Sequence, residues 1–164
     1  MAYGNVRYRA STALEAFVLN QAPRHHSDSN APSTFTELLD WRAEASDTDS
    51  MPVYDGGSEL TIYSHDRYNY AFRAWHDKIH LDLNLGFGKL DEMAVCAEHV
   101  RQMRAHQVMF NLTDEDIRAL QYDVAGQVLY YYNRGEYVHD QARFVQVCFD
   151  FRSMFKVIRS GVKY

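Results

Sequence analysis

Residues 66–106 read DRYNYAFRAWHDKIHLDLNLGFGKLDEMAVCAEHVRQMRAH, and this stretch decides the fold of the chain. Its first half carries apolar side chains at steps of three and four residues, the spacing of one face of an α-helix: Tyr68, Phe72, Trp75, Ile79 and Leu83. Gly86 and Gly88 favour a helix end there. A second helical pattern follows over about residues 90–106. The sequence therefore predicts two consecutive helices joined by a short turn.

Two further helices are predicted downstream. Thr113 and Asp116 form an approximate capping box at the start of the third helix, and Asn133-Arg134-Gly135 ends it. A fourth helix is expected over about residues 138–159, with a broad apolar face made of Phe144, Val145, Cys148, Phe151, Phe155 and Ile158. Because short loops place successive helices antiparallel, we expect a mainly α fold, a four-helix up-and-down bundle over about residues 66–160.

The N-terminal part of the chain shows shorter signals. A short helix is predicted to end at Gln21, and residues 23–33 have the Pro, Ser, Asn, Asp and His content of a mobile linker. Residues 1–33 are therefore expected to form an N-terminal arm and linker. Another short helix is predicted over about residues 34–46. The length of the chain fits one domain over residues 1–164.

A small β-hairpin is the prediction for residues 53–63. Val53-Tyr54 and Leu60–Tyr63 have strand-forming side chains, and they flank Asp55-Gly56-Gly57, whose glycines accept a positive φ. A plain extended loop is the alternative for this segment.

Composition excludes several classes of protein. Hydrophobic residues make up 46% of the 164 residues and aromatic residues 14%, which is enough material for a folded core. The formal net charge is −5, so the chain lacks the basic excess that phosphate neutralisation demands, and direct nucleic-acid binding is disfavoured.

Cys96 and Cys148 lie in apolar helical patterns, which predicts two buried, reduced thiols.

Hydropathy gives no sign of a membrane protein. No apolar run approaches the roughly 20 residues that a membrane span needs. Residues 1–21 also lack the continuous apolar segment of a signal peptide. We therefore expect a cytoplasmic protein.

One stretch has the spacing of a metal site. His76 and His80 are four residues apart on a predicted helix, so both imidazoles lie on one face and can share an ion. Asp91 or Glu92, on the first turn of the next helix, would supply an acidic third ligand. Three such ligands leave one position open for water, as in catalytic zinc sites. Imidazole and carboxylate ligands suit zinc, manganese or iron about equally.

The sequence His76-Asp77-x-x-His80 resembles the His-Glu-x-x-His helix of zincin metallopeptidases. The resemblance covers about 25 residues and includes the acidic residue downstream. It implies a small metal-dependent hydrolase in which Asp77 occupies the position of the general base. In such an enzyme Asp77 would steer or deprotonate the metal-bound water.

The chain also resembles HD-type phosphohydrolases, which hold their metal with a His, a His-Asp doublet and a later Asp. The corresponding residues are the doublets His65-Asp66, His76-Asp77 and His139-Asp140, with Asp123 as the lone carboxylate. We rank this interpretation below the zincin-like one, because no upstream His lies on a well-formed helix.

Residues 53–145 resemble small uncharacterised proteins of tailed bacteriophages, in stretches such as Phe72-Arg73-Ala74-Trp75-His76-Asp77 and Asp123-Val124-Ala125-Gly126-Gln127. This resemblance implies a compact protein made in the cytoplasm of an infected bacterium. The resemblance implies no activity. A non-enzymatic role, in which the acidic surface binds a host protein, is a hypothesis that suits such a protein. Exposed Tyr and Phe side chains would favour a homo-oligomer in a variant of this hypothesis.

Polar residues lie beside the apolar face of each long predicted helix and are expected to meet inside the bundle: His76, His80, Glu92, His99, Asp123, Gln127 and Gln141. A satisfied hydrogen-bond network that only specifies the fold is one interpretation, and a metal site is the other. Because no catalytic motif is complete, the binding role is our first hypothesis and the metal-dependent hydrolase the alternative.

Overall fold

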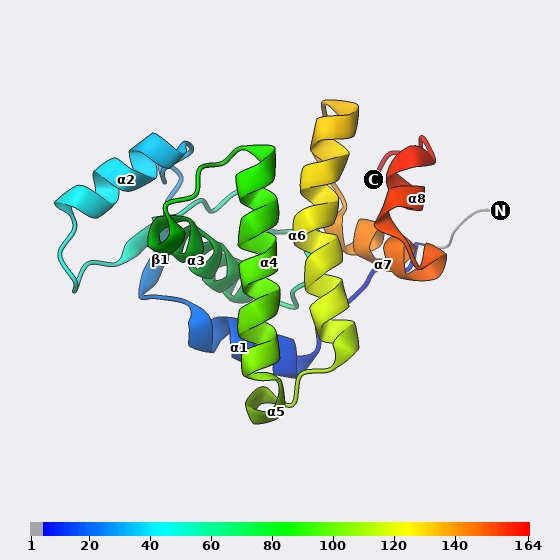
Figure 1. The fold of residues 1–164 in the computed structure, drawn as a ribbon, viewed down its shortest axis with the longest axis horizontal. Coiled ribbons are helices and arrows are strands. Elements are labelled where there is room, and N and C mark those ends of the chain that lie inside the picture. Colours follow the sequence, from blue (N-terminus) through cyan, green and yellow to red (C-terminus); the bar gives the residue numbers. More distant parts are fainter. Residues whose placement is uncertain (1–4) are drawn as a thin grey trace.

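The computed structural model describes residues 5–164, which fold into eight helices and two short strands (Figure 1). In chain order the elements are α1 Thr12–Gln21, β1 His25–Ser27, α2 Phe35–Glu44, β2 Met51–Val53, α3 Asp66–Leu83, α4 Lys89–Ala105, α5 Gln107–Phe110, α6 Asp114–Arg134, α7 Gln141–Phe151 and α8 Met154–Arg159. The predicted mainly α class is confirmed. Among residues 5–164, none of the helices combines the length and the apolar character that a membrane crossing requires.

Helices α4 and α6 pack side by side and antiparallel at the centre of the fold, and the short helix α5 joins their ends (Figure 1). The predicted capping box at the start of α6 is present, because the Thr113 hydroxyl accepts from the Asp116 amide and the Asp116 carboxylate accepts from the Thr113 amide, at 3.1 and 2.8 Å. Gly135, with a φ of 71°, ends α6 in the left-handed conformation. Local capping signals therefore set both ends of this helix as predicted.

Helix α3 packs against α1, and this contact places the N-terminal segment in the core. Leu14, Phe17 and Val18 of α1 are fully buried. Phe17 meets the Trp75 ring edge to face, with ring centroids 5.3 Å apart. Ser11 caps α1 through its hydroxyl. The expected arm is therefore wrong for α1, whose apolar stripe is covered by α3.

The small sheet differs from the predicted hairpin. β2 pairs in parallel with β1, so the expected linker over residues 23–33 contains a strand. The segment after β2 is irregular because its backbone bonds distant parts of the chain: Ala10 donates to the Ile62 carbonyl and Ala142 to the Leu60 carbonyl, at 2.9 and 3.0 Å. The hairpin near residues 53–63 was therefore wrong, and the extended-loop alternative describes the segment.

The predicted fourth helix is divided. α7 ends at Arg152, which has a φ of 52°, and the hydroxyl of Ser153 caps the first turn of α8. α8 turns back onto α6 and α7 and buries Val157 and Ile158. Two helices therefore cover α6 where one was expected, and the four-helix up-and-down bundle over residues 66–160 is not confirmed. Cys96 and Cys148 are free and buried, as predicted.

Candidate metal centre

His76, His80 and Glu92 bring three possible metal ligands together. His76 and His80 lie one turn apart on α3, and their Nε2 atoms are 3.0 Å apart. Glu92, on the first turn of α4, places one carboxylate oxygen 3.2 Å from His76 Nε2 and the other 3.5 Å from His80 Nε2. The two predicted imidazoles therefore turn toward an acidic side chain of the neighbouring helix.

The turn between α3 and α4 decides which acidic residue reaches the imidazoles. Asn84 adopts the left-handed conformation, and the Leu85 amide then donates to the His80 carbonyl. The Asp91 carboxylate accepts from the Gly86 amide at 2.8 Å, so Asp91 holds the turn. Of the two acidic residues left open by the sequence, Glu92 lies with the imidazoles and Asp91 does not.

The hydrogen bond of His80 fixes its tautomer. Its Nδ1 lies 2.9 Å from the carbonyl oxygen of Leu85, which can only accept, so Nδ1 carries the proton. The Nε2 lone pair of neutral His80 then points toward His76 and Glu92. Metal-bound histidines in proteins commonly donate their other ring N–H to a carbonyl or carboxylate in this way.

His76 has a second buried histidine as its partner. Its Nδ1 lies 3.0 Å from Nε2 of His99, on α4. His99 is fully buried, its ring stands edge-on to Trp75 at 4.0 Å, and its own Nδ1 has no hydrogen-bond partner. Burial, together with the charges of His76 and His80, lowers the pKa of His99 well below its ordinary value. His99 is therefore neutral, and one proton is shared between its Nε2 and His76 Nδ1.

The shared proton leaves two arrangements for the site. With the proton on His76 Nε2, that atom donates to His80 or Glu92. In the second arrangement His76 Nδ1 carries the proton and donates it to His99. The Nε2 lone pairs of His76 and His80 then face each other, with the two atoms 3.0 Å apart. The second arrangement requires a cation between them. The same space thus accepts either a proton or a metal ion.

Electrostatics favour positive charge at this point. Burial alone would raise the pKa of Glu92, but the hydrogen bonds and charges of the imidazoles of His76 and His80, when these carry a second proton, lower it to about 2. Burial likewise opposes a charge on His80, yet the hydrogen bond and charge of Glu92 raise its pKa. Glu92 is therefore an anion at neutral pH and attracts either a proton or a metal cation to the imidazoles.

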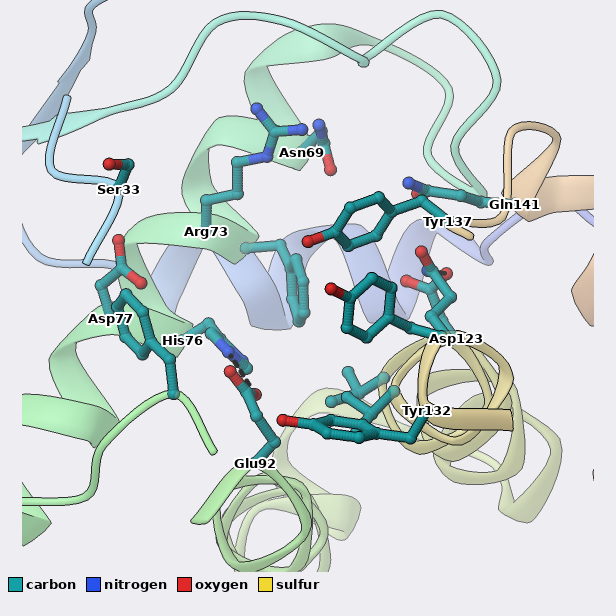
Figure 2. A pocket seen from close by; sticks show the side chains of 16 residues that line it. Ser33, Asn69, Arg73, His76, Asp77, Glu92, Asp123, Tyr132, Tyr137 and Gln141 are labelled. Carbon is teal, nitrogen blue, oxygen red and sulfur yellow. Dashed lines mark hydrogen bonds and ion pairs between the residues drawn. The ribbon is translucent and has the colours of Figure 1, made fainter. Parts of the chain in front are cut away.

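A pocket of about 460 Å³ opens beside this cluster, between α3, α4 and α6 (Figure 2). The side chains of His76 and Glu92 are 18% and 17% exposed, so the cluster is open to the pocket. Asp77 also lines the pocket, but Figure 2 shows its carboxylate directed toward Ser33 and away from the contact between His76 and Glu92. Burial raises the pKa of Asp77.

The other predicted polar residues divide between the cluster and the pocket wall. Asp123, Gln127 and Gln141 line the same pocket, and burial raises the pKa of Asp123 to about 7 although a hydrogen bond from Gln127 opposes the shift. The sequence pattern does not indicate that the Leu85 carbonyl holds His80 or that aromatic side chains such as Phe72 and Tyr132 line the pocket. Both features depend on how the helices pack.

The doublets of the HD-type comparison do not meet. His65 caps α3 by accepting from the Arg67 amide, and Asp140 caps α7 and pairs with Arg7. Only the His76-Asp77 doublet lies at the pocket among residues 5–164. The HD-type arrangement of ligands is therefore wrong for this chain.

Comparison of the chain with protein-family models, with curated proteins and with solved structures found no match.

Proposed function

We propose that the protein binds one divalent transition-metal ion, zinc in the first instance, through His76, His80 and Glu92, and that it uses the ion to hydrolyse a small substrate held in the pocket. The observation that carries the proposal is the spacing of the ligand atoms. Ligands about 2.0–2.1 Å from a tetrahedral zinc ion lie roughly 3.3–3.4 Å from one another. The two Nε2 atoms are 3.0 Å apart, and each lies near a different Glu92 oxygen, His76 Nε2 at 3.2 Å and His80 Nε2 at 3.5 Å. One ligand atom from each residue lies within 4.8 Å of the other two.

The hydrolytic role is supported by the open side of the cluster. Three protein ligands leave one coordination position for water, and His76 and Glu92 border the pocket. Zinc lowers the pKa of its bound water to about 7, which supplies hydroxide at neutral pH. Asp77 lines the same pocket and is the candidate for accepting or steering the proton of that water, a role that requires its carboxylate to turn from Ser33 toward the cluster.

Metal content tests the first part of the proposal. Protein purified without chelator, then loaded with zinc and desalted, should retain about one zinc ion per chain. His76→Ala and Glu92→Gln should each lower the zinc affinity by tenfold or more, on the order of one lost ligand. His139→Ala removes an exposed histidine far from the site in sequence and serves as the matched control. Retention of wild-type zinc affinity by both ligand variants would contradict the proposal.

Activity tests the second part. Zinc-loaded protein should hydrolyse a small activated ester such as 4-nitrophenyl acetate faster than the His76→Ala variant, and chelation followed by zinc addition should remove and restore the difference. Asp77→Asn should lower the rate without lowering the zinc content. Equal rates for wild type and His76→Ala would leave a metal-binding protein without hydrolytic activity.

A non-enzymatic role in binding a host protein stays a prediction. The surface that would suit it is the tip of the molecule at α5, where Val108 and Met109 are 96% and 78% exposed. Val108→Ser combined with Met109→Ser should then abolish capture of a bacterial partner without changing the zinc content. Formation of a homo-oligomer through exposed aromatic side chains also stays a prediction.

A further inference from the structure

The wall of the pocket opposite the metal ligands carries a buried carboxyl and a carboxamide side by side. Asp123 on α6 is 3% exposed, and one of its oxygens accepts from Gln127 Nε2 at 2.7 Å. Both side chains line the pocket. Figure 2 shows Asp123 across the pocket from His76 and Glu92. The side chains of Asp123 and Gln127 therefore present hydrogen-bond donors and acceptors side by side on this wall of the pocket.

Two further carboxamides border the same space. Asn69 is 4% exposed, and its Nδ2 donates to the Ser58 hydroxyl at 2.9 Å, so its oxygen can still accept. Gln141, at the start of α7, extends into the pocket from the other side (Figure 2). Carboxamide groups match amide-like edges of a ligand because each has adjacent donors and acceptors.

The charge of the pocket disfavours anionic ligands. Three carboxyl groups line it, those of Asp77, Glu92 and Asp123. Among the described residues that line the pocket, Arg73 is the one permanent cation, and its guanidinium donates to the Tyr54 carbonyl and lies over the Tyr54 ring. In the metal-free protein a phosphate or carboxylate would therefore meet like charges, and an uncharged ligand would not. A zinc ion at His76, His80 and Glu92 would offset part of this negative charge, so the charge argument applies to the pocket without the ion.

Aromatic side chains form the remaining surfaces. Phe72 and Phe87 lie beside the metal ligands, with Phe87 edge-on to His80 at 4.8 Å between ring centroids. Tyr132 and Tyr137 extend into the pocket from α6 and the turn after it (Figure 2). Flat aromatic faces with a few convergent polar groups are typical of sites that hold a planar ring.

We infer that the pocket binds an uncharged heteroaromatic ring with an amide-like edge, the chemistry of a nucleobase or of a nucleoside without phosphate. The ring packs among the aromatic side chains, its polar edge hydrogen-bonds Asp123 and Gln127, and the opposite side of the ring faces the metal. This inference rests on the proposed function, because it names the substrate class of the same site.

Binding to zinc-loaded wild-type protein tests the inference, by calorimetry and by saturation-transfer NMR. The probes are adenosine and cytidine, and the controls are AMP, ribose and benzyl alcohol. We expect saturable binding of at least one nucleoside. In chelator-treated protein AMP should bind about tenfold or more weakly than adenosine, because its phosphate then meets the carboxylates with no zinc ion to offset them. Ribose lacks the ring and benzyl alcohol lacks the amide-like edge, so neither should bind comparably.

Substitutions of Asp123 and Gln127 test whether the nucleoside binds at this wall of the pocket. Gln127→Leu and Asp123→Leu should each weaken nucleoside binding by about tenfold or more, because the polar edge of the nucleobase then loses a hydrogen-bond partner. Gln127 is only partly buried, so we expect Gln127→Leu to fold, and it can be measured even if Asp123→Leu does not fold. Gln146→Leu is the matched control, because Gln146 forms the same type of bond, to Asp150 on α7 at 3.1 Å, away from the pocket.

Zinc content measured in the same samples separates the two proposals. Protein that binds zinc but neither nucleoside would overturn the inference and leave the metal site in place. Equal affinity of the chelator-treated protein for adenosine and AMP, or undiminished binding by Gln127→Leu, would overturn it as well. Protein that binds no zinc would overturn the proposed function, and the inference with it.

Discussion

Nδ1 of His76 lies 3.0 Å from Nε2 of His99, and His99 is a fully buried histidine whose other ring nitrogen has no partner. This relationship ties a candidate metal ligand to the interior of the protein. When the His76 proton is donated to His99, His76 Nε2 is free to bind a cation. His99 therefore orients His76, and by accepting this proton it would leave His76 Nε2 free for the metal of the proposed function.

Replacing His99 should weaken metal binding more than it harms the fold. His99→Phe removes the acceptor for His76 Nδ1, and we expect the zinc affinity to fall by about 10- to 100-fold, the usual effect of losing such a partner. The measurement is competition with a chromogenic chelator. His99→Gln keeps an acceptor oxygen and should recover part of the affinity. Unchanged zinc affinity in His99→Phe would show that His76 needs no partner.

Asp123 should make the stability of the metal-free protein depend on pH. Burial raises its pKa from the ordinary 3.8 to about 7. The folded state thus holds this proton more tightly than the unfolded state, so stability falls as the pH rises from about 4 to 7. The shift corresponds to roughly 4 kcal/mol as an upper limit. Asp123→Asn cannot ionise and keeps an oxygen for Gln127.

We therefore expect Asp123→Asn to be more stable than the wild type at pH 8, and the difference to shrink toward pH 4. Urea denaturation in the presence of a chelator at several pH values measures this. Asp150→Asn changes an exposed carboxylate with a similar glutamine partner and should show no such gain. A difference that is independent of pH would contradict the raised pKa of Asp123.

Gly126 allows α6 and α7 to approach closely. A Cβ atom added to Gly126 would lie 2.7 Å from a ring carbon of Phe144, which is fully buried. Gly126→Ala should therefore lower the free energy of unfolding by about 1–3 kcal/mol through overpacking. Gly88, the residue before α4, has open space around it and an ordinary φ of −73°. Gly88→Ser should consequently cost nothing, and equal losses in both variants would contradict the packing argument.

The sequence was sufficient to predict the helices whose ends carry strong local signals. Thr113 and Gly135 bound α6, and the spacing of His76 and His80 placed both imidazoles on one face of α3. Glu92 and His99 are seven positions apart, about two helical turns, which explains why both side chains face α3. These features depend on local geometry alone.

Contacts between distant segments decided the rest. Adjacent residues on a helix point about 100° apart, so whether Asp91 or Glu92 met the imidazoles depended on the α3–α4 turn, where the Gly86 amide binds Asp91. The pairing of β1 with β2 likewise requires α2 to bring two segments together. Hydrophobic spacing carries no information about either contact.

The end of α7 was unpredictable because arginine does not usually end a helix, and it provides a final test. Arg152 holds a φ of 52°, a conformation that costs a side-chain-bearing residue about 1–2 kcal/mol. Arg152→Gly should therefore raise the free energy of unfolding by up to about 1 kcal/mol, after the greater flexibility of glycine in the unfolded chain is subtracted. Asn84 has a similar φ of 51°, but asparagine tolerates it, so Asn84→Gly should gain less. Destabilisation by Arg152→Gly would show instead that contacts of the Arg152 side chain outweigh the strain, contrary to this prediction.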